Sequence, residues 1–183
     1  MKKDILILFA LVLVAAVLIM GVDIQSVDEY YLAHADDIQP DSQTVTLSIR
    51  CDMVLENYDK LDKALQSEAY VPADGVILPQ TTFVLRSGDT VFDILYRAVR
   101  YYRIPFEYQG ADQNRLGGVY VEGIHYLYEF SCGPTSGWVY RVNGEFPDRG
   151  CSNYELRDGD VIEWLYTCNL GMDVGDIWEG DGA

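Results

Sequence analysis

Four cysteines and two histidines are the residues of this chain that could take part in metal binding, disulfide bonding or nucleophilic catalysis. The cysteines are Cys51, Cys132, Cys151 and Cys168. No two of them have the short spacing of a zinc knuckle, so metal binding is disfavoured against disulfide bonding. Their even number suits an oxidising compartment, in which thiols pair as disulfides.

The two histidines, His34 and His125, give little support for a catalytic function. A Ser-His-Asp or Cys-His arrangement needs a histidine beside its nucleophile, and only His125 lies in the patterned part of the chain. No phosphate-binding glycine loop with a following lysine is present. Catalysis by a pair of carboxylates stays an alternative, because 29 acidic residues make chance proximity common. We therefore predict a protein that is not an enzyme and requires no cofactor.

Aromatic side chains are the better candidates for binding, because the chain has 14 tyrosines and three tryptophans. Tyrosine suits half-buried sheets and recognition faces alike. Trp138 and Tyr140 share one strand face after the loop of residues 133–137 and could contact a flat ligand; core packing is the alternative. Tyr126 and Tyr128 are further candidates.

The net charge of −16 excludes nucleic acid as a natural partner, since a polyphosphate gains nothing from such a surface. Solubility explains the charge better than an acidic binding patch does. The C-terminal end includes Asp173 and Asp176, but it lacks the spacing of a calcium loop, so residues 176–183 are predicted to be a solvated acidic tail.

Residues 1–22 are predicted to be a single transmembrane signal anchor. Lys2 and Lys3 precede an apolar run over residues 5–22, which as a helix is about 27 Å long and can span a bilayer. The lysines before the run place the N-terminus in the cytoplasm and the rest of the chain outside. A cleaved signal peptide is the alternative, although its apolar core is usually only ~7–15 residues long.

Residue patterns predict one main helix among several strands. The helix begins at Thr90, where Thr90 and Asp93 form a capping box, and ends before Pro105. Strands are predicted over 44–52, 119–132, 137–143 and 155–167, and over 76–78 and 82–85 either as a pair or as one strand interrupted by Pro79. Residues 57–67 form a short helix or a loop. In the strand over 119–132, alternation places Ile124, Tyr126, Tyr128 and Phe130 on one side.

This order of elements predicts an α+β, β-grasp (ubiquitin-like) domain, with the main helix on a mixed sheet and the first and last strands adjacent and parallel. Cys51 and Cys168 each end the apolar face of one of these two strands. If the strands lie side by side, Cys51 can reach Cys168, which leaves Cys132 to pair with Cys151. The expected organisation is anchor 1–22, acidic spacer 23–42, β-grasp domain 43–175 and tail 176–183.

The segment over residues 133–175 resembles the transcobalamin-like C-terminal domain of bacterial membrane-anchored surface proteins. The likeness rests on the Ser-Gly-Trp, Val-Asn-Gly, Tyr-x-Leu and Asp-Gly-Asp-x-Ile-x-Trp elements. The matching residues are Trp138, Asn143, Gly144, Gly150, Tyr154, Asp158, Gly159, Asp160 and Ile162. The resemblance implies a soluble ligand-binding β-grasp domain.

Function follows from that resemblance as an expectation. It implies an extracellular binding module that captures a corrinoid or cobalamin-type ligand for a membrane transporter. The alternative is a structural or adhesion domain that binds a protein or glycan on the cell surface. In both cases the expected location is the cell membrane, with a single pass, the N-terminus in the cytoplasm and the C-terminal domain outside.

Overall fold

The computed structural model describes residues 38–115 and 117–176. The predicted anchor over 1–22 and most of the predicted spacer and tail lie outside these residues. Within the described part of the chain, no helix has the length and apolar character needed to cross a membrane.

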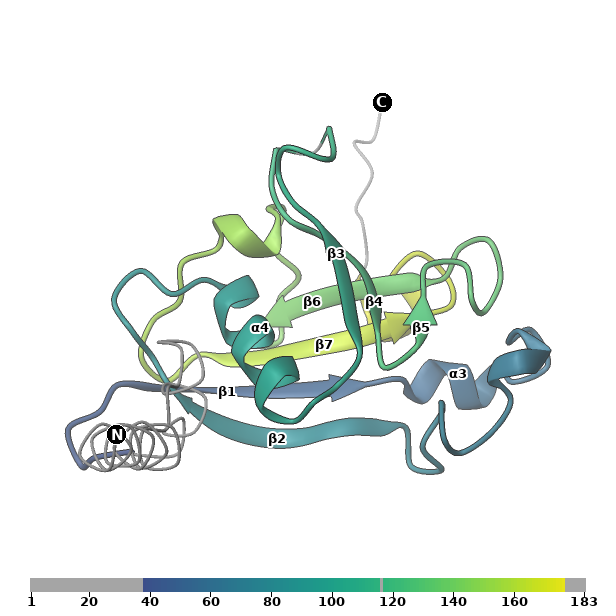
Figure 1. Ribbon diagram of the computed structural model, residues 1–183, viewed down its shortest axis with the longest axis horizontal. Helices are drawn as coiled ribbons and strands as arrows, with labels where there is room; N and C mark the ends of the chain where they lie inside the picture. The colour runs from purple at the N-terminus through teal and green to yellow at the C-terminus, as the bar shows by residue number, and fades with distance from the viewer. Residues whose placement is uncertain (1–37, 116, 177–183) are drawn as a thin grey trace, which may run out of the picture. The chain divides into compact units, whose positions relative to one another are not determined.

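The principal sheet has four strands in the order β2-β1-β7-β6 (Figure 1). They are β1 (Thr44–Arg50), β2 (Val76–Val84), β6 (Gly137–Val142) and β7 (Val161–Thr167). β1 and β7 are parallel, with Leu47 opposite Ile162, whereas the other neighbours are antiparallel. This mixed sheet confirms the predicted α+β class and the parallel pairing of the first and last strands.

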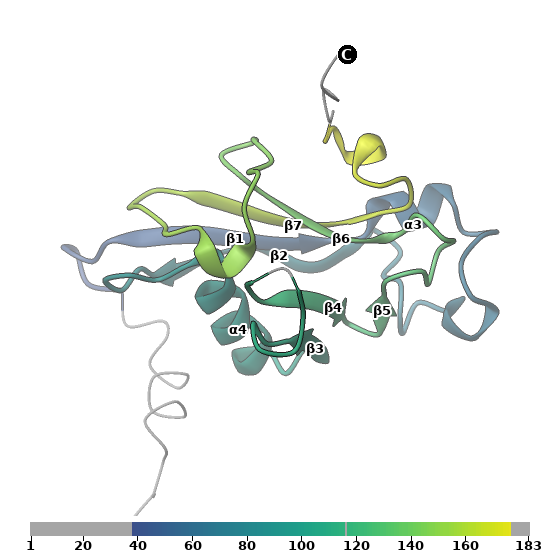
Figure 2. The ribbon, with the colours of Figure 1, turned by 90° about the horizontal axis from the view of Figure 1, so that it is seen from above.

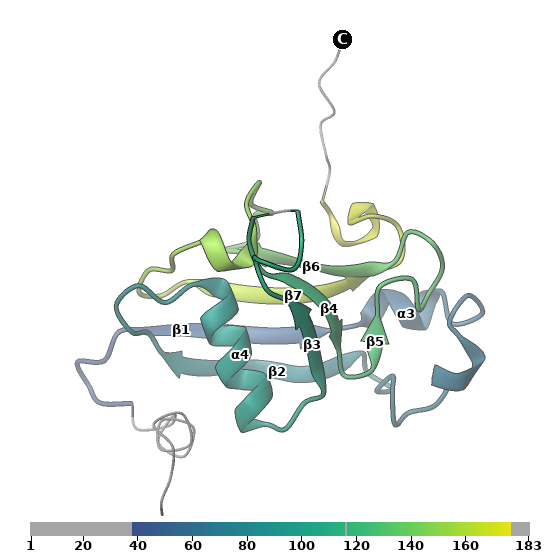
Figure 3. The same cartoon turned by 45° about the horizontal axis from the view of Figure 1, so that its top comes forward.

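Helix α4 (Val91–Tyr101) crosses this sheet in front of β1 and β2 (Figure 3). Its capping box is formed as predicted: the Thr90 side chain accepts from the Asp93 N–H, and Asp93 accepts from the Thr90 N–H. The buried residues of α4 are Val91, Ile94, Leu95, Ala98 and Val99. They join the inward side chains of β1 and β7 in the main apolar core, so periodicity located the packing face correctly.

A second sheet of three strands, β3-β4-β5, lies on the same side of the principal sheet as α4 (Figure 2). It consists of β3 (Phe106–Gln109), β4 (Tyr120–Ile124) and β5 (Leu127–Tyr128). The prediction of one strand over 119–132 was wrong. The chain reverses at His125 and Tyr126, whose φ angles are 53° and 66°, so β5 runs antiparallel to β4 and the proposed common face of Ile124 to Phe130 is not formed.

Residues between β1 and β2 form short helices and a second apolar core. Helix α3 (Asp52–Glu56) follows β1, and η1 (Lys63–Leu65) lies in the segment predicted as a short helix or loop. The second core contains Cys51, Val54, Leu61, Val71, Leu127, Cys132, Tyr166 and Cys168. β2 is one strand that includes Pro79, which an edge strand can accommodate.

Two further short helices lie late in the chain, η2 (Cys151–Asn153) before β7 and η3 (Met172–Val174) after it. Asp173 of η3 accepts hydrogen bonds from the Thr167 hydroxyl and from the Cys168 N–H, which fold the chain back onto the end of β7. Asp173, which precedes the predicted tail, therefore has a structural role.

Candidate functional site

Trp138, Tyr140 and Trp164 line a cavity of about 400 Å³ beside β6, which we call the aromatic pocket. Its other walls are formed by residues 118–120 and 147–151. Two adjacent strands position the rings: Tyr140 lies directly opposite Trp164 in the β6–β7 ladder, and Trp138 lies two residues from Tyr140 along β6. Residues opposite or two apart in such a ladder share a sheet face, so the strands direct all three rings to the same side.

Tyr140 joins the aromatic pocket to the loop over 147–151. Its ring centroid lies 5.5 Å from that of Trp164, and its hydroxyl donates to the Arg149 carbonyl at 2.6 Å. Burial is the main cause that raises the pKa of Tyr140, so the side chain is a neutral phenol at physiological pH. Tyr140 thus offers an uncharged aromatic face and holds one wall of the pocket in place.

Trp138 is shared between the pocket and the second core. Its Nε1 donates to the Leu127 carbonyl at 2.8 Å, and its ring packs edge-to-face on Tyr166 at a centroid distance of 5.2 Å. The indole therefore has a fixed orientation. Its half-buried position agrees with the expectation that Trp138 is available both to the core and to a ligand.

Trp164 has a polar atom without a partner. Its side chain is 2% exposed, and Nε1 is the sole buried side-chain nitrogen or oxygen of the described residues that has no hydrogen bond. An unsatisfied buried donor costs about 1–3 kcal/mol, so such groups are rare and need an explanation. Trp164 is also one of the residues that line the aromatic pocket.

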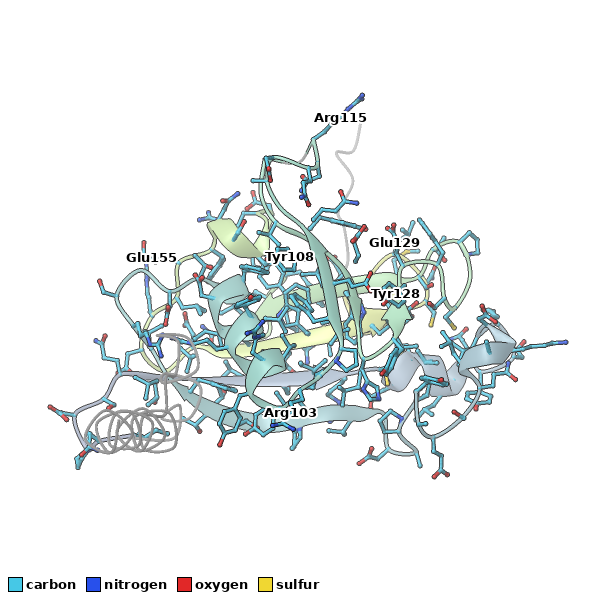
Figure 4. The ribbon with its side chains drawn as sticks, in the orientation of Figure 1. Arg103, Tyr108, Arg115, Tyr128, Glu129 and Glu155 are labelled. Carbon is cyan, nitrogen blue, oxygen red and sulfur yellow. The ribbon has the colours of Figure 1, made fainter. Side chains whose placement is uncertain are left out.

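Tyr126 and Tyr128, the other predicted ligand contacts, do not line this pocket. Tyr126 is 45% exposed and packs on Tyr70, and Tyr128 donates through its hydroxyl to Glu107 at 2.8 Å. Figure 4 shows Tyr128 at the β5 end of the second sheet. The structure therefore brings together Trp138 and Tyr140, adds Trp164, and places the other two tyrosines elsewhere.

A second, more polar cavity of about 650 Å³ lies nearby and shares Arg149 with the aromatic pocket. Its polar groups largely satisfy one another. Asp160 accepts from the Asn143 side chain and from the Arg157 N–H, both at 2.8 Å, while Asn143 accepts from the Val161 N–H. These contacts fix the turn that follows β6 and the turn that precedes β7.

The four cysteines are free thiols in the structure, so neither the Cys51–Cys168 nor the Cys132–Cys151 bond is present. The β1–β7 register explains the first difference. Ile49 lies opposite Trp164, which places Cys51 opposite Tyr166 and leaves Cys168 two residues, or about 7 Å, further along.

The second predicted pair is separated by the packing of the domain. Cys151 belongs to the main core, whereas Cys132 belongs to the second core. Among the described residues, no group of three or more cysteine, histidine or acidic side chains is arranged to hold a metal ion.

Comparison with known proteins gives one family match. Residues 88–167 match the family described as a domain of unknown function, DUF4430. No curated protein matches the sequence.

Two solved structures are similar to the chain. Haptocorrin in complex with Cbi is 14% identical, with a TM-score of 0.46 over 73% of this chain and 27% of haptocorrin, so the chain spans about a quarter of haptocorrin. A Ruminococcus gnavus protein described as metal binding is 10% identical, with a TM-score of 0.40 over 68% of this chain and 96% of that protein. The segment that carries the tryptophan and turn motifs lies within the family match.

Proposed function

We propose that the domain is a non-catalytic binding module that holds one side of a flat, amide-bearing ligand in the aromatic pocket. The observation that carries this proposal is the buried, unpartnered Nε1–H of Trp164, a residue that lines the pocket beside the ring of Tyr140. Aromatic faces favour a flat ring system, and the indole donor favours a carbonyl oxygen on it. The resemblance of residues 133–175 to the transcobalamin-like domain makes a corrinoid the first ligand to test.

The size of the pocket limits how such a ligand binds. Ligand sites commonly enclose ~300–1,000 Å³, and the aromatic pocket, at about 400 Å³, is near the lower end. A corrin ring with its amide side chains is larger than that, so one edge enters and the rest remains open to solvent or to a partner protein. This geometry suits a module that presents a ligand to a membrane transporter.

A titration with cobalamin and cobinamide tests the proposal directly. We expect corrinoid absorption to shift, and tryptophan fluorescence to be quenched, on addition of the wild-type chain. Tyr140→Leu should weaken binding at least tenfold, because it removes a pocket wall. Tyr108→Leu, which removes an aromatic ring outside the pocket, should bind as wild type. Absence of any spectral change at high micromolar ligand would remove corrinoids from consideration.

The fold and placement that we propose are a β-grasp domain held outside the cell by residues 1–22. The parallel β1–β7 pair with α4 across it supports the β-grasp assignment, and the lysine-flanked apolar run supports the anchor. Protease treatment of intact cells should release the domain while the N-terminal segment stays with the membrane. Protection of the domain until the cells are lysed would contradict this placement.

A second candidate function, binding of a protein or glycan at the cell surface, is favoured by an outer aromatic cluster. Phe92 and Tyr96 of α4 pack against Phe106 and Tyr108 of β3, with Phe92 and Tyr108 centroids 5.0 Å apart. Tyr108 is 39% exposed and labelled in Figure 4. Glycan-array binding or pull-down from membrane extract that is lost in Tyr108→Leu and kept in Tyr140→Leu would support this function over the corrinoid one.

A further inference from the structure

We propose that Cys132 and Cys168 form the disulfide of this domain, while Cys51 and Cys151 remain thiols. The proposal replaces the Cys51–Cys168 and Cys132–Cys151 pairs that the sequence predicted. It is independent of what the aromatic pocket binds.

Cys132 and Cys168 lie at the same end of the β6–β7 pair. Gly137 and Thr167 form the last cross-strand pair there; Cys168 follows Thr167, and Cys132 precedes the turn that leads into Gly137. The turn is fastened to the chain beyond β7 by two hydrogen bonds, from the Thr135 hydroxyl to the Cys168 carbonyl at 2.8 Å and from the Leu170 N–H to the Thr135 carbonyl at 2.9 Å. The backbone on both sides of a bridge is thus already held together.

The two sulfur atoms also occupy one site against α3. Cys168 Sγ lies 3.5 Å from the Met53 carbonyl oxygen, and Cys132 Sγ lies 3.5 Å from the Asn57 carbonyl oxygen. Those carbonyls are one helical turn apart, and the Asn57 side chain donates to the Met53 carbonyl at 2.9 Å. Each thiol also contributes to the shift in pKa of the other, which agrees with their closeness. A bond between the two sulfurs would therefore form within this site.

The remaining cysteines are less well placed to pair. Cys51 shares the second core with Cys132 and Cys168, but it is displaced from Cys168 by two residues along the β1–β7 ladder. Cys151 Sγ lies 3.7 Å from the Val119 carbonyl oxygen in the main core.

Oxidation requires an external disulfide of the glutathione class. One cysteine thiolate attacks a sulfur of this oxidant and releases a thiol; the second cysteine then attacks the mixed disulfide and releases another thiol. The protein loses two hydrogens, and the oxidant is reduced to two thiols. Cys132 and Cys168 are 1% and 6% exposed, so the exchange should occur during folding, before the second core closes.

Non-reducing peptide mapping of the full-length chain tests the pairing. The chain is refolded in detergent with reduced and oxidised glutathione, and its free thiols are alkylated after denaturation. We expect a single Cys132–Cys168 link and alkylation of Cys51 and Cys151. A link that involves Cys51 or Cys151, or alkylation of all four cysteines, would overturn the proposal.

Thermal unfolding with and without reductant provides the second measurement. Reduction of the wild-type protein should lower the melting temperature by about 10 °C, as expected for one disulfide in a domain of this size. Cys151→Ser is the matched control and should keep that shift, whereas Cys132→Ser should abolish it. An equal shift in both variants, or none in the wild type, would contradict the assignment. The corrinoid titration is unaffected by these outcomes, so the two proposals fail separately.

Discussion

Trp164 lines the aromatic pocket, and its buried Nε1 donor has no hydrogen-bond partner. Because that donor has no partner, Trp164→Phe removes no hydrogen bond from the unliganded domain, and the replacement ring keeps most of the packing. We expect affinity for cobinamide to fall about tenfold, equivalent to about 1.4 kcal/mol, measured by absorption titration. Tyr140→Phe keeps its ring and loses only the bond to Arg149, so it should bind nearly as wild type. Unchanged affinity in Trp164→Phe would show that the indole N–H does not meet the ligand.

His125 makes stability depend on pH. Burial lowers its pKa, opposed by a weaker backbone hydrogen bond with Ala69. The folded state therefore holds the imidazole neutral below the unfolded pKa of ~6.5, so its contribution is complete above that value and is lost as pH falls through the lower folded pKa. We expect wild type to lose more unfolding free energy than His125→Asn between pH 8 and pH 5, measured by urea denaturation.

Asparagine is the appropriate replacement at position 125, because it tolerates the left-handed backbone that His125 adopts at φ 53°. The comparison between the two proteins cancels the carboxylates, which titrate in both. A stability difference that stays constant with pH would show that His125 does not carry the effect.

Some site residues were predictable from sequence and others were not, for a physical reason. Alternation along one strand places Trp138 and Tyr140 together, and the structure keeps them together. Alternation also places Trp164 on an apolar face, but it cannot distinguish a core ring from one that lines a cavity. The neighbour of each strand residue depends on register, which explains why Cys168 was paired with the wrong partner.

At the scale of elements, a partly buried ion pair fastens α4 to the chain before it. Arg97 of α4 donates to Asp89 at 2.7 Å and to the Val84 carbonyl at 2.9 Å, and the two charged side chains are 13% and 12% exposed. Burial lowers the pKa of Arg97, opposed chiefly by the charge of Asp89. We expect Arg97→Met to lower the unfolding free energy by about 3 kcal/mol, because it leaves Asp89 without its counter-charge.

The matched control for Arg97 is Arg50, which pairs with Asp52 at 2.5 Å near the surface, with side-chain exposures of 40% and 35%. Solvent screens that pair, so Arg50→Met should cost under about 1 kcal/mol. Equal losses in urea denaturation of the two variants would contradict the role given to burial.

Element prediction succeeded where short-range signals are strong. The capping box at Thr90 marks the helix start, and Asn143-Gly144 marks the end of β6, where both residues have positive φ. It failed at the β4–β5 turn, because His125 and Tyr126 adopt left-handed conformations without a glycine, asparagine or proline to signal a turn. Packing of the short second sheet holds that turn, and such long-range contacts are not visible in local sequence.

At the scale of the whole domain, β7 is the strand that joins β6 to the rest of the principal sheet. A chain that ends at Asp160 lacks β7 and leaves β6 without its partner in that sheet. We expect this chain to show no cooperative melting transition by circular dichroism and poor amide dispersion by NMR. A chain that ends at Asp176 retains all the described elements and should unfold cooperatively. A sharp transition in the shorter chain would show that β1 and β2 suffice with α4.

The parallel pairing of β1 with β7 also imposes a delay between the synthesis of β1 and the formation of this strand pair. Leu47 and Ile162 are partners across the sheet although 115 residues separate them in the chain. At a synthesis rate of ~5–20 residues per second, β7 is synthesised roughly 6 to 23 seconds after β1. During that interval one edge of β1 has no partner strand, so the nascent chain exposes unpaired backbone groups until its last strand emerges.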